Sequence, residues 1–322
     1  MFDEADEAVK RTPTAKPLPV IPGIEPVDPE RVKIDMTKRL GRGSSGTVFQ
    51  GSLDGTEIAV KEIALAKKQL PDMTANEIQV FNKVDHKNLV KFMGYTCKDE
   101  KQTRYLLILL EYIQGESLDK IITSHELKIE YSISELKKYQ ILLDLASVME
   151  YLHGVGMHVI HGDIKPVNVM LTKDGVVKLC DLGLSKFAQD TSLTMKTTLN
   201  PKGTPVYMAP EQVLESKTSS TKTDVYSFGA TMFEILYEEP LREEEVQTEL
   251  VQSLKESPIP NKVLQMQDDP AYEVLLGCLK KASDRLNAEC IVRMLTAIYR
   301  NMADRNNQDS SHTVLQSCVP HT

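Results

Sequence analysis

Three side chains in the second half of the chain carry oxygen atoms at a spacing that could serve phosphoryl transfer. Asp163 and Asn168 lie within residues 161–168, which read HGDIKPVN, and Asp181 follows 18 positions after Asp163. A carboxylate can orient a hydroxyl group, while a carboxamide and a second carboxylate are the hard oxygen ligands that Mg²⁺ prefers. Lys165 could neutralise charge that builds on a transferring phosphoryl group. A single aspartate in a turn is more often a helix cap, but the full set in this order predicts phosphoryl transfer.

A glycine-rich turn near the start of the chain is a second candidate for phosphate chemistry. Gly41, Gly43 and Gly46 precede Val48 and lie between two strand-like runs. Glycines allow backbone N–H groups to approach phosphate oxygens that a β-carbon would obstruct. The same spacing opens dinucleotide-binding folds, but those folds place a helix directly after it. Because residues 47–63 read as two strands, the turn predicts a phosphate loop of a different fold.

Lys61 lies 15 residues beyond this turn, at the end of the strand-like run that contains Ala59. A lone lysine on an amphipathic strand is usually a solvated charge. This lysine follows a phosphate loop and has a candidate partner, Glu77, on the next predicted helix. The pattern therefore favours a phosphate-binding lysine held by a carboxylate.

The apolar pattern divides the central part of the chain into two halves. From residue 34 to 111, short strand-like runs are separated by glycine and Asp-Gly turns, with one helical segment at 72–84. Beyond Gly115, apolar residues recur every three or four positions and predict helices, the first beginning at a capping box of Ser132 and Glu135. Further buried helices are predicted near 224–237 and 287–300. Strands followed by helices predict an α+β fold of two lobes, with a ligand site between them.

Composition limits the function classes. The chain has 322 residues, 41% of them hydrophobic, and a formal net charge of −8. This excludes wholesale disorder and argues against a general nucleic-acid binder, which is normally basic. No apolar run approaches the ~20 residues of a membrane helix, and the acidic start differs from a signal peptide. Five scattered cysteines predict reduced thiols. We expect a soluble cytoplasmic protein without membrane insertion, and leave a nuclear location open.

The two ends of the chain differ from its centre. Residues 1–31 contain six prolines within 17 positions and little periodic apolar pattern, which predicts a flexible arm. Residues 301–322 are polar and aperiodic, which predicts a fraying tail.

Together these motifs resemble the protein kinase family over residues 32–300. The resemblance implies a bilobal α+β fold: a small β-rich N-lobe at 32–112 with one regulatory helix, and a larger, mostly helical C-lobe at 113–300. It implies that Asp163 is the catalytic base, assisted by Lys165, and that Asn168 and Asp181 hold Mg²⁺. The residues that it places around ATP are Gly41, Arg42, Gly43, Ser44, Ser45, Gly46, Val48, Ala59, Lys61, Glu77, Leu110, Glu111, Ile113 and Asp181.

Further segments match the family beyond the nucleotide site. Leu110 resembles the gatekeeper and residues 111–113 the hinge, while Phe81, His161 and Leu182 resemble the apolar spine. Glu211 ends the activation segment and has a family partner in Arg285. The stretch DVYSFG at 224–229 resembles the start of the central helix.

The acceptor type also follows from the resemblance. Serine/threonine kinases carry a lysine two residues after the catalytic aspartate, as Lys165 is here, and a threonine in the substrate loop, as Thr204 is in GTPVYMAPE at 203–211. Residues 181–186 and 224–229 are most similar to the tyrosine-kinase-like branch, near receptor-interacting kinases.

Gly162 departs from the family, which usually has arginine there to grip a phosphate on the activation segment. We therefore expect that phosphorylation of the threonines at 191–198 is not the main activating event, and that a partner or a homodimer activates the enzyme. Leu182 replaces the phenylalanine that is usual in the family, and Leu286 replaces a proline. We expect both changes to have only local effects. Cys180 is interpreted as a small buried residue rather than a reactive thiol.

Three function classes fit these observations. The first is a serine/threonine protein kinase that uses ATP and Mg²⁺, acts on protein substrates in signal transduction and does not bind nucleic acid. The second is a pseudokinase or scaffold, which Gly162 favours and the complete set of site residues opposes. The third is a small-molecule kinase of the aminoglycoside or choline type, which Lys165 and residues 203–211 oppose.

Overall fold

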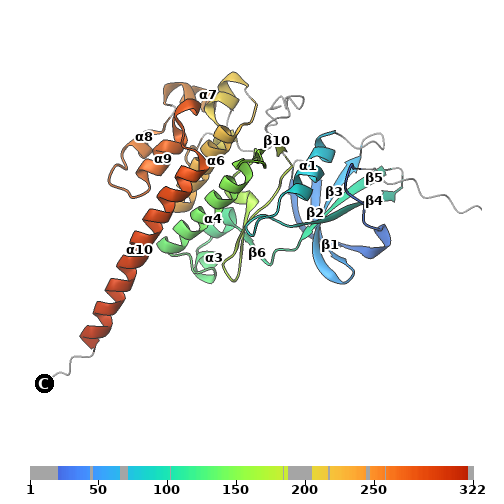
Figure 1. Ribbon diagram of the computed structural model, residues 1–322, viewed down its shortest axis with the longest axis horizontal. Coiled ribbons are helices and arrows are strands. Elements are labelled where there is room, and N and C mark those ends of the chain that lie inside the picture. The colour runs from blue at the N-terminus through green and yellow to red at the C-terminus, as the bar shows by residue number, and fades with distance from the viewer. Residues whose placement is uncertain are drawn as a thin grey trace, which may run out of the picture.

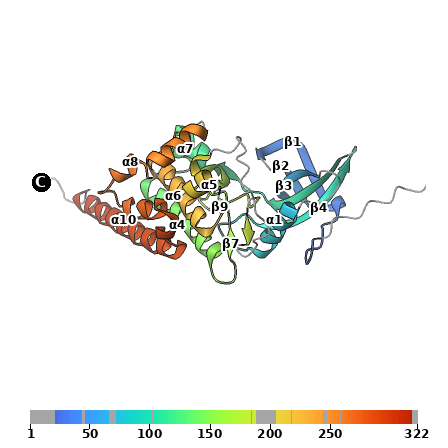
Figure 2. The ribbon, with the colours of Figure 1, turned by 90° about the horizontal axis from the view of Figure 1, so that it is seen from above.

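The computed structural model describes residues 21–43, 46–65, 72–101, 103–183, 185–187, 205–216, 218–243, 247–257 and 259–317. They form two lobes that lie side by side, a β-rich N-lobe and a larger helical C-lobe (Figures 1 and 2). The predicted bilobal α+β fold is confirmed. Helix α1 lies between the strands and the larger lobe in Figure 1.

The N-lobe is built on a five-stranded antiparallel sheet with the order β1-β2-β3-β5-β4. Strand β5 alternates its apolar side chains between the two faces: Leu106, Ile108 and Leu110 join the core cluster that also contains residues of α1, whereas Leu107 and Leu109 face the other way. Such two-residue alternation is what a strand requires to bury both faces. The elements are β1 (Val32–Gly43), β2 (Gly46–Leu53), β3 (Thr56–Leu65), α1 (Asp72–Lys83), β4 (Phe92–Glu100) and β5 (Thr103–Glu111).

The C-lobe is organised around α6 (Thr221–Tyr237), nearly all of whose residues are buried. Ser220 caps this helix, its side chain accepting a hydrogen bond from the backbone N–H of Thr223. The C-lobe also contains two small sheets. In one, β8 (Val169–Thr172) pairs with β6 (Gly115–Ser117) on one side and β9 (Val177–Leu179) on the other. In the second, β7 (Val159–Ile160) pairs with β10 (Lys186–Phe187). The other helices are α2 (Leu118–Thr123), α3 (His125–Glu130), α4 (Glu135–His153), α5 (Pro210–Glu215), α7 (Gln247–Glu256), α8 (Asn261–Leu264), α9 (Tyr272–Leu279) and α10 (Ala288–Ser317).

The predicted capping box of α4 is wrong by two residues. Ser132 has a φ of +51° and its N–H donates to Ile129, so it belongs to the turn that ends α3. Ser134 is the cap instead, and its hydroxyl accepts from the N–H of Lys137 at 3.2 Å. A left-handed residue cannot serve as an extended N-cap, which moves the start of the helix to Glu135.

The described part of each end segment, residues 21–31 and 301–317, is ordered. Residues 1–20 lie outside the described part, but Ile21 is 1% exposed and residues 21–31 pack against the N-lobe. At the other end α10 continues past residue 300 to Ser317 and projects from the C-lobe (Figure 1). No glycine or proline occurs between 301 and 319 to stop a helix that a buried segment has already begun.

Candidate active site

Lys61 joins the two lobes through a pair of carboxylates. The pairing of β3 with β2 and β5 places Lys61 opposite Val48 and Ile108, in the middle of the sheet. Its Nζ lies 2.6 Å from Glu77 Oε1 on α1 and 2.9 Å from Asp181 Oδ1 in the C-lobe. The predicted pair of Lys61 and Glu77 is therefore brought together, and Asp181 joins it as a second partner of Lys61.

Burial and charge act in opposite directions on this group. Burial disfavours the ammonium form of Lys61, which is 5% exposed, but the two carboxylates outweigh burial and raise its pKa. Burial also opposes the charge on Asp181, yet Lys61 and the N–H of Gly183 lower the pKa of that carboxyl. A lysine cation and an aspartate anion are thus held at the lobe boundary, where phosphate and metal charges would be bound.

The glycine-rich turn forms the closed end of the β1–β2 hairpin. Gly41 pairs with Val48, Arg42 with Thr47, and Gly43 with Gly46. A β-carbon on Gly46 would come within 2.4 Å of the carbonyl oxygen of Glu62, so glycine is required there by the neighbouring strand. At Gly41 a β-carbon would meet none of the described atoms within 4 Å. Ser44 and Ser45, predicted at the tip, lie outside the described residues.

The loop after β7 holds the second group of predicted residues. Asp163 Oδ1 lies 2.9 Å from Lys165 Nζ. The side-chain nitrogen of Asn168 donates to Asp163 twice, to its backbone oxygen at 2.8 Å and to Oδ2 at 2.9 Å. The backbone oxygen of Asn168 accepts from the N–H of Cys180 at 2.8 Å, which ties this loop to the residue before Asp181.

These contacts fit the donor set that magnesium requires. Because Asn168 donates through its nitrogen to Asp163, its amide oxygen is directed elsewhere as an acceptor. Lys61 and Gly183 both contact Oδ1 of Asp181, and no hydrogen bond to Oδ2 is found within the described ranges. Among the described residues no group of three or more His, Cys, Asp or Glu side chains could hold a metal ion by itself. A cation bound by Asn168 and Asp181 would therefore take phosphate oxygens as its further ligands.

Asp224, at the start of α6, fixes the backbone that precedes Asp163. Its carboxylate accepts from the N–H groups of His161 and Gly162, each at 2.8 Å, and lies 2.8 Å from His153 Nε2. Gly162 has a φ of +81°, a conformation that costs any other residue energy. Sequence reasoning found Asp224 only as a helix start, and it missed His153, whose partner is 71 residues away.

His161 is fully buried and neutral in this arrangement. Burial lowers its pKa below the usual value. The ring agrees with one tautomer: Nδ1 accepts from the N–H of Asp163 at 3.2 Å, and Nε2 lies 3.2 Å from the carbonyl oxygen of Cys180, to which it donates. The predicted spine residues His161, Phe81 and Leu182 are each at most 1% exposed.

The predicted pair between Glu211 and Arg285 forms in the C-lobe. Arg285 Nη1 and Nη2 contact the two oxygens of Glu211 at 2.6 and 2.8 Å, a bidentate geometry. Arg285 also donates to the carbonyl oxygens of Lys222 and Lys280. Cys180 was predicted to be buried but is only partly buried. Burial of its thiol, aided by Asp181, raises its pKa to about 12, which agrees with an unreactive thiol.

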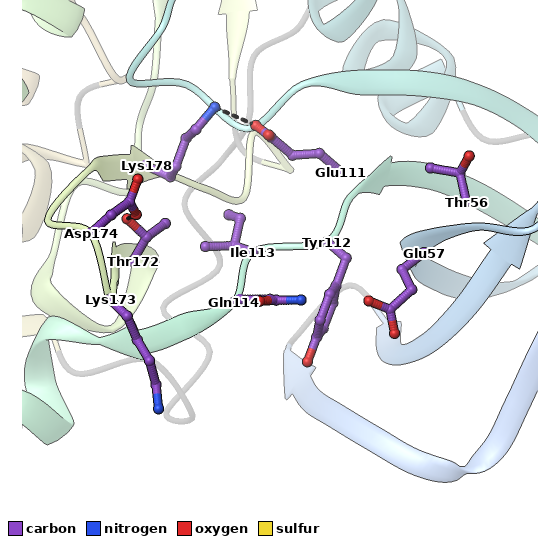
Figure 3. Close-up of a pocket in the computed structure, with 10 residues that line it drawn as sticks. All are labelled: Thr56, Glu57, Glu111, Tyr112, Ile113, Gln114, Thr172, Lys173, Asp174 and Lys178. Atoms are coloured by element: carbon purple, nitrogen blue, oxygen red, sulfur yellow. Dashed lines mark hydrogen bonds and ion pairs between the residues drawn. The ribbon is translucent and has the colours of Figure 1, made fainter.

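The residues predicted as the hinge border a hollow (Figure 3). Glu111 accepts from the N–H of Lys91 at 2.8 Å and from Lys178 Nζ at 2.6 Å, the contact drawn as a dashed line. The hollow has a volume of about 550 Å³, and Lys61, Asp163 and Asp181 are not among the residues that line it. Its lining is Thr56, Glu57, Glu111, Tyr112, Ile113, Gln114, Thr172, Lys173, Asp174 and Lys178.

Two further residues predicted around the nucleotide, Ala59 and Leu110, are neighbours in the N-lobe sheet. Ala59 lies opposite Leu110 in the sheet, and Leu110 is 7% exposed. Thr204 lies outside the described residues. The contacts of Ala59, Leu110 and Ile113 with ATP stay predictions.

Comparison with known proteins agrees with this geometry. The model of the protein kinase domain family matches residues 34–295. This chain belongs to the protein kinase family. The predicted family is confirmed, and the tyrosine-kinase-like branch is consistent with the relatives of this kinase.

Similar proteins are kinases of several kinds. A probable L-type lectin-domain containing receptor kinase S.5 of Arabidopsis thaliana is 37% identical, over 62% of this chain and 30% of its own length. The probable serine/threonine-protein kinase SIS8 of the same plant is 34% identical, over 63% and 19%. The dual specificity protein kinase shkD of Dictyostelium discoideum is 34% identical, over 64% and 26%. The aligned part covers less than a third of each of these relatives.

The predicted cytoplasmic location is contradicted by these comparisons. Several relatives of this kinase are named receptor kinases, among them the lectin-domain kinase and a receptor protein kinase of Oryza sativa. Within the described residues no helix is long and apolar enough to cross a membrane. The composition of a kinase domain therefore does not define where the protein that contains it is located.

Proposed function

We propose that this chain is an ATP-dependent serine/threonine protein kinase that transfers the γ-phosphoryl group to hydroxyls of protein substrates. The observation that carries the proposal is the joining of Lys61, Glu77 and Asp181 across the lobes, with Asp163 and Asn168 bonded to each other beside them. A module that only binds partners has no need of this complete set, and we therefore do not propose a pseudokinase.

Each residue of the set has a distinct role in the proposed reaction. Asp163 orients the acceptor hydroxyl and takes its proton as the oxygen forms a bond to phosphorus and the bond to ADP breaks. Lys165, 2.9 Å from Asp163, balances charge on the moving phosphoryl group. Lys61 binds the phosphates, held in place by Glu77. Bound Mg²⁺ supplies further charge neutralisation, and Asn168 and Asp181 would hold it.

Two observations support serine or threonine as the acceptor. Lys165 lies two residues beyond Asp163 and contacts it, as in the serine/threonine branch. Two relatives are named serine/threonine-protein kinases. Because the relatives include receptor kinases, we propose a role in signal transduction for the protein that carries this domain.

We also propose that a partner or a homodimer activates the enzyme, rather than phosphate on the activation segment. Gly162 has no side chain to grip such a phosphate, and Asp224 already holds its backbone N–H. Treatment with a phosphatase should leave activity largely unchanged. Loss of activity on this treatment, restored by a phosphate-mimicking residue at 191–198, would contradict the proposal.

The decisive experiment measures transfer from labelled ATP with Mg²⁺ to a generic protein substrate. The wild type should label serine or threonine, and Asp163→Asn should lower the rate by roughly 10²–10⁴-fold, the usual contribution of a general base. Asp174→Asn, in an exposed turn, is the matched control and should keep full activity. Equal activity of the Asp163 variant, or labelling of amino-sugars or choline in place of protein, would reject the proposal.

A further inference from the structure

The segment 21–31 is folded onto the N-lobe by a tight turn. The carbonyl oxygen of Ile21 accepts from the N–H of Ile24 at 3.1 Å, and Gly23 between them has a φ of +77°. Proline at the second position and a left-handed glycine at the third are the signature of a type II turn. The sequence Ile-Pro-Gly-Ile thus specifies a local structure within a region whose prolines predicted an open chain.

Tyr95 on β4 holds this turn through its hydroxyl group and the residues after it through its backbone oxygen. Its hydroxyl accepts from the N–H of Ile21 and donates to the carbonyl oxygen of Ile24, each at 3.2 Å. Its backbone oxygen accepts from the N–H of Val27 at 2.7 Å. Tyr95 is 0% exposed, so the docked segment satisfies buried polar groups of the strand.

The segment passes around the edge of the sheet, since β4 is its last strand. Ile21 belongs to the large core cluster that extends through both lobes and also includes Ile78 and Phe81 of α1. Val27 packs with the opposite cluster, and a β-carbon on Gly94 would come within 2.6 Å of its side chain. One segment of the chain therefore contacts both faces of the strand on which α1 rests.

Helix α1 has few other supports. It has 12 residues, and within the described part of the chain its main packing partners are β4 and β10. Because β10 follows Asp181 in the C-lobe, β4 is the N-lobe support of the helix that carries Glu77. Moving this support changes where Glu77 meets Lys61.

We propose that residues 21–31 are a clamp that positions α1, so that Glu77 stays paired with Lys61. This inference rests on the proposed function, because it assigns Ile21 and Tyr95 as positioning residues for the phosphate-binding lysine. The segment that covers Tyr95 is the chain's own Ile-Pro-Gly-Ile turn.

The test is hydrogen exchange of the α1 amides in the full chain, which requires no catalytic activity. Ile21→Ser should speed exchange over residues 72–83 by roughly tenfold or more, since loss of a buried aliphatic side chain shifts a local equilibrium by at least that factor. Ile21→Val should restore values near the wild type. Ile129→Ser, at an isoleucine that is 66% exposed, is the matched control and should change nothing in α1.

A clamp on α1 and a general support of the N-lobe differ in which amides exchange faster when it is weakened. Exchange in the β1–β2 hairpin should stay at the wild-type rate, and the KM for ATP of Ile21→Ser should rise several-fold. Tyr95→Phe, which removes only the hydroxyl, should shift α1 in the same direction by a smaller factor, and it decides the matter if Ile21→Ser does not fold. Equal acceleration in the hairpin and α1, or none in α1, would overturn the clamp. An inactive wild type would reject the proposed function and leave the exchange result standing.

Discussion

The two halves of the active site are held by different kinds of contact. In the C-lobe, Asp163 and Asn168 are bonded to each other, and the backbone before them is fixed by Asp224. In the N-lobe, Lys61 and Glu77 meet only at the ends of long side chains that come from different elements. Backbone hydrogen bonds fix a loop in one geometry, whereas a contact between side-chain tips depends on where the elements lie.

This difference indicates which half can be adjusted. The C-lobe half forms a fixed platform. Arg285, the bidentate partner of Glu211, also donates to the carbonyl oxygen of Lys222 on α6, the helix that carries Asp224. The N-lobe half requires α1 to be in place, and the docked segment 21–31 contributes to that placement. Variants in the platform should therefore affect stability first, and variants in the N-lobe half should affect activity first.

The largest expected effect is the loss of the platform pair. Arg285→Ala leaves Glu211 without its bidentate partner, and removing one member of a buried pair costs about 3–5 kcal/mol of unfolding free energy. Arg31→Ala is the matched control, because Arg31 forms a similar contact with Asp54 but its side chain is 54% exposed. Denaturant unfolding should show a large drop for the first variant and little change for the second. Similar midpoints for both would show that the buried pair does not support the platform.

Lys61→Met should break the N-lobe half while leaving the fold in place. Loss of a fixed cation at the phosphates should lower kcat/KM by about 10²–10³-fold. Glu77 can then take up a proton, since burial already raises its pKa, so the unfolding transition should move little. Lys98→Met, at another lysine of the same lobe that pairs with Glu62, should keep activity. If Lys61→Met lowered the stability of the fold but kept its activity, the assignment of activity to the N-lobe half and stability to the C-lobe half would be reversed.

Gly162→Ala should test the backbone of the platform with a smaller change. A side chain at a φ of +81° costs about 1–2 kcal/mol, as does Gly55→Ala at a φ of +85° in the β2–β3 turn. The two variants should lose similar stability in thermal unfolding, but only Gly162→Ala should lower kcat, because its N–H bond to Asp224 sets the position of Asp163. Equal kcat values for Gly162→Ala and Gly55→Ala would show that the backbone at Gly162 has no role in catalysis.

The smallest effect is the pH dependence that His161 gives to the platform. Its pKa in the fold is below the usual 6.5, so the unfolded chain binds more protons as the pH falls through that value. The fold should therefore lose stability below about pH 6.5, with a slope of at most about 1.4 kcal/mol per pH unit. In His161→Phe the contribution of His161 to this slope should disappear. The difference in unfolding free energy between the wild type and the variant should therefore narrow from pH 7.5 to 5.5. His86, also lowered by burial, is common to both and cancels. A constant difference would mean that His161 does not titrate as described.

Much of the site could be predicted because its residues are close in sequence. Asp163, Lys165 and Asn168 lie in one loop, where spacing alone restricts their positions, and the structure brings them together. His153 could not be found in this way, because its partner Asp224 is on another helix. The cap of α4 was misplaced since Ser132 and Ser134 are equally good cap residues, and only the left-handed backbone of Ser132 distinguishes them.

The sequence by itself determined the two-lobed order of strands and helices, the glycine-rich turn at residues 41–46 and the loop that brings Asp163, Lys165 and Asn168 together. These depend on periodicity, glycine and short spacing, which act locally along the chain. Only the tertiary structure decided that residues 21–31 are ordered and that Lys61 meets both Glu77 and Asp181. A proline-rich segment carries no periodic signal. It becomes ordered only where residues such as Tyr95 satisfy its backbone hydrogen bonds and its apolar side chains are buried.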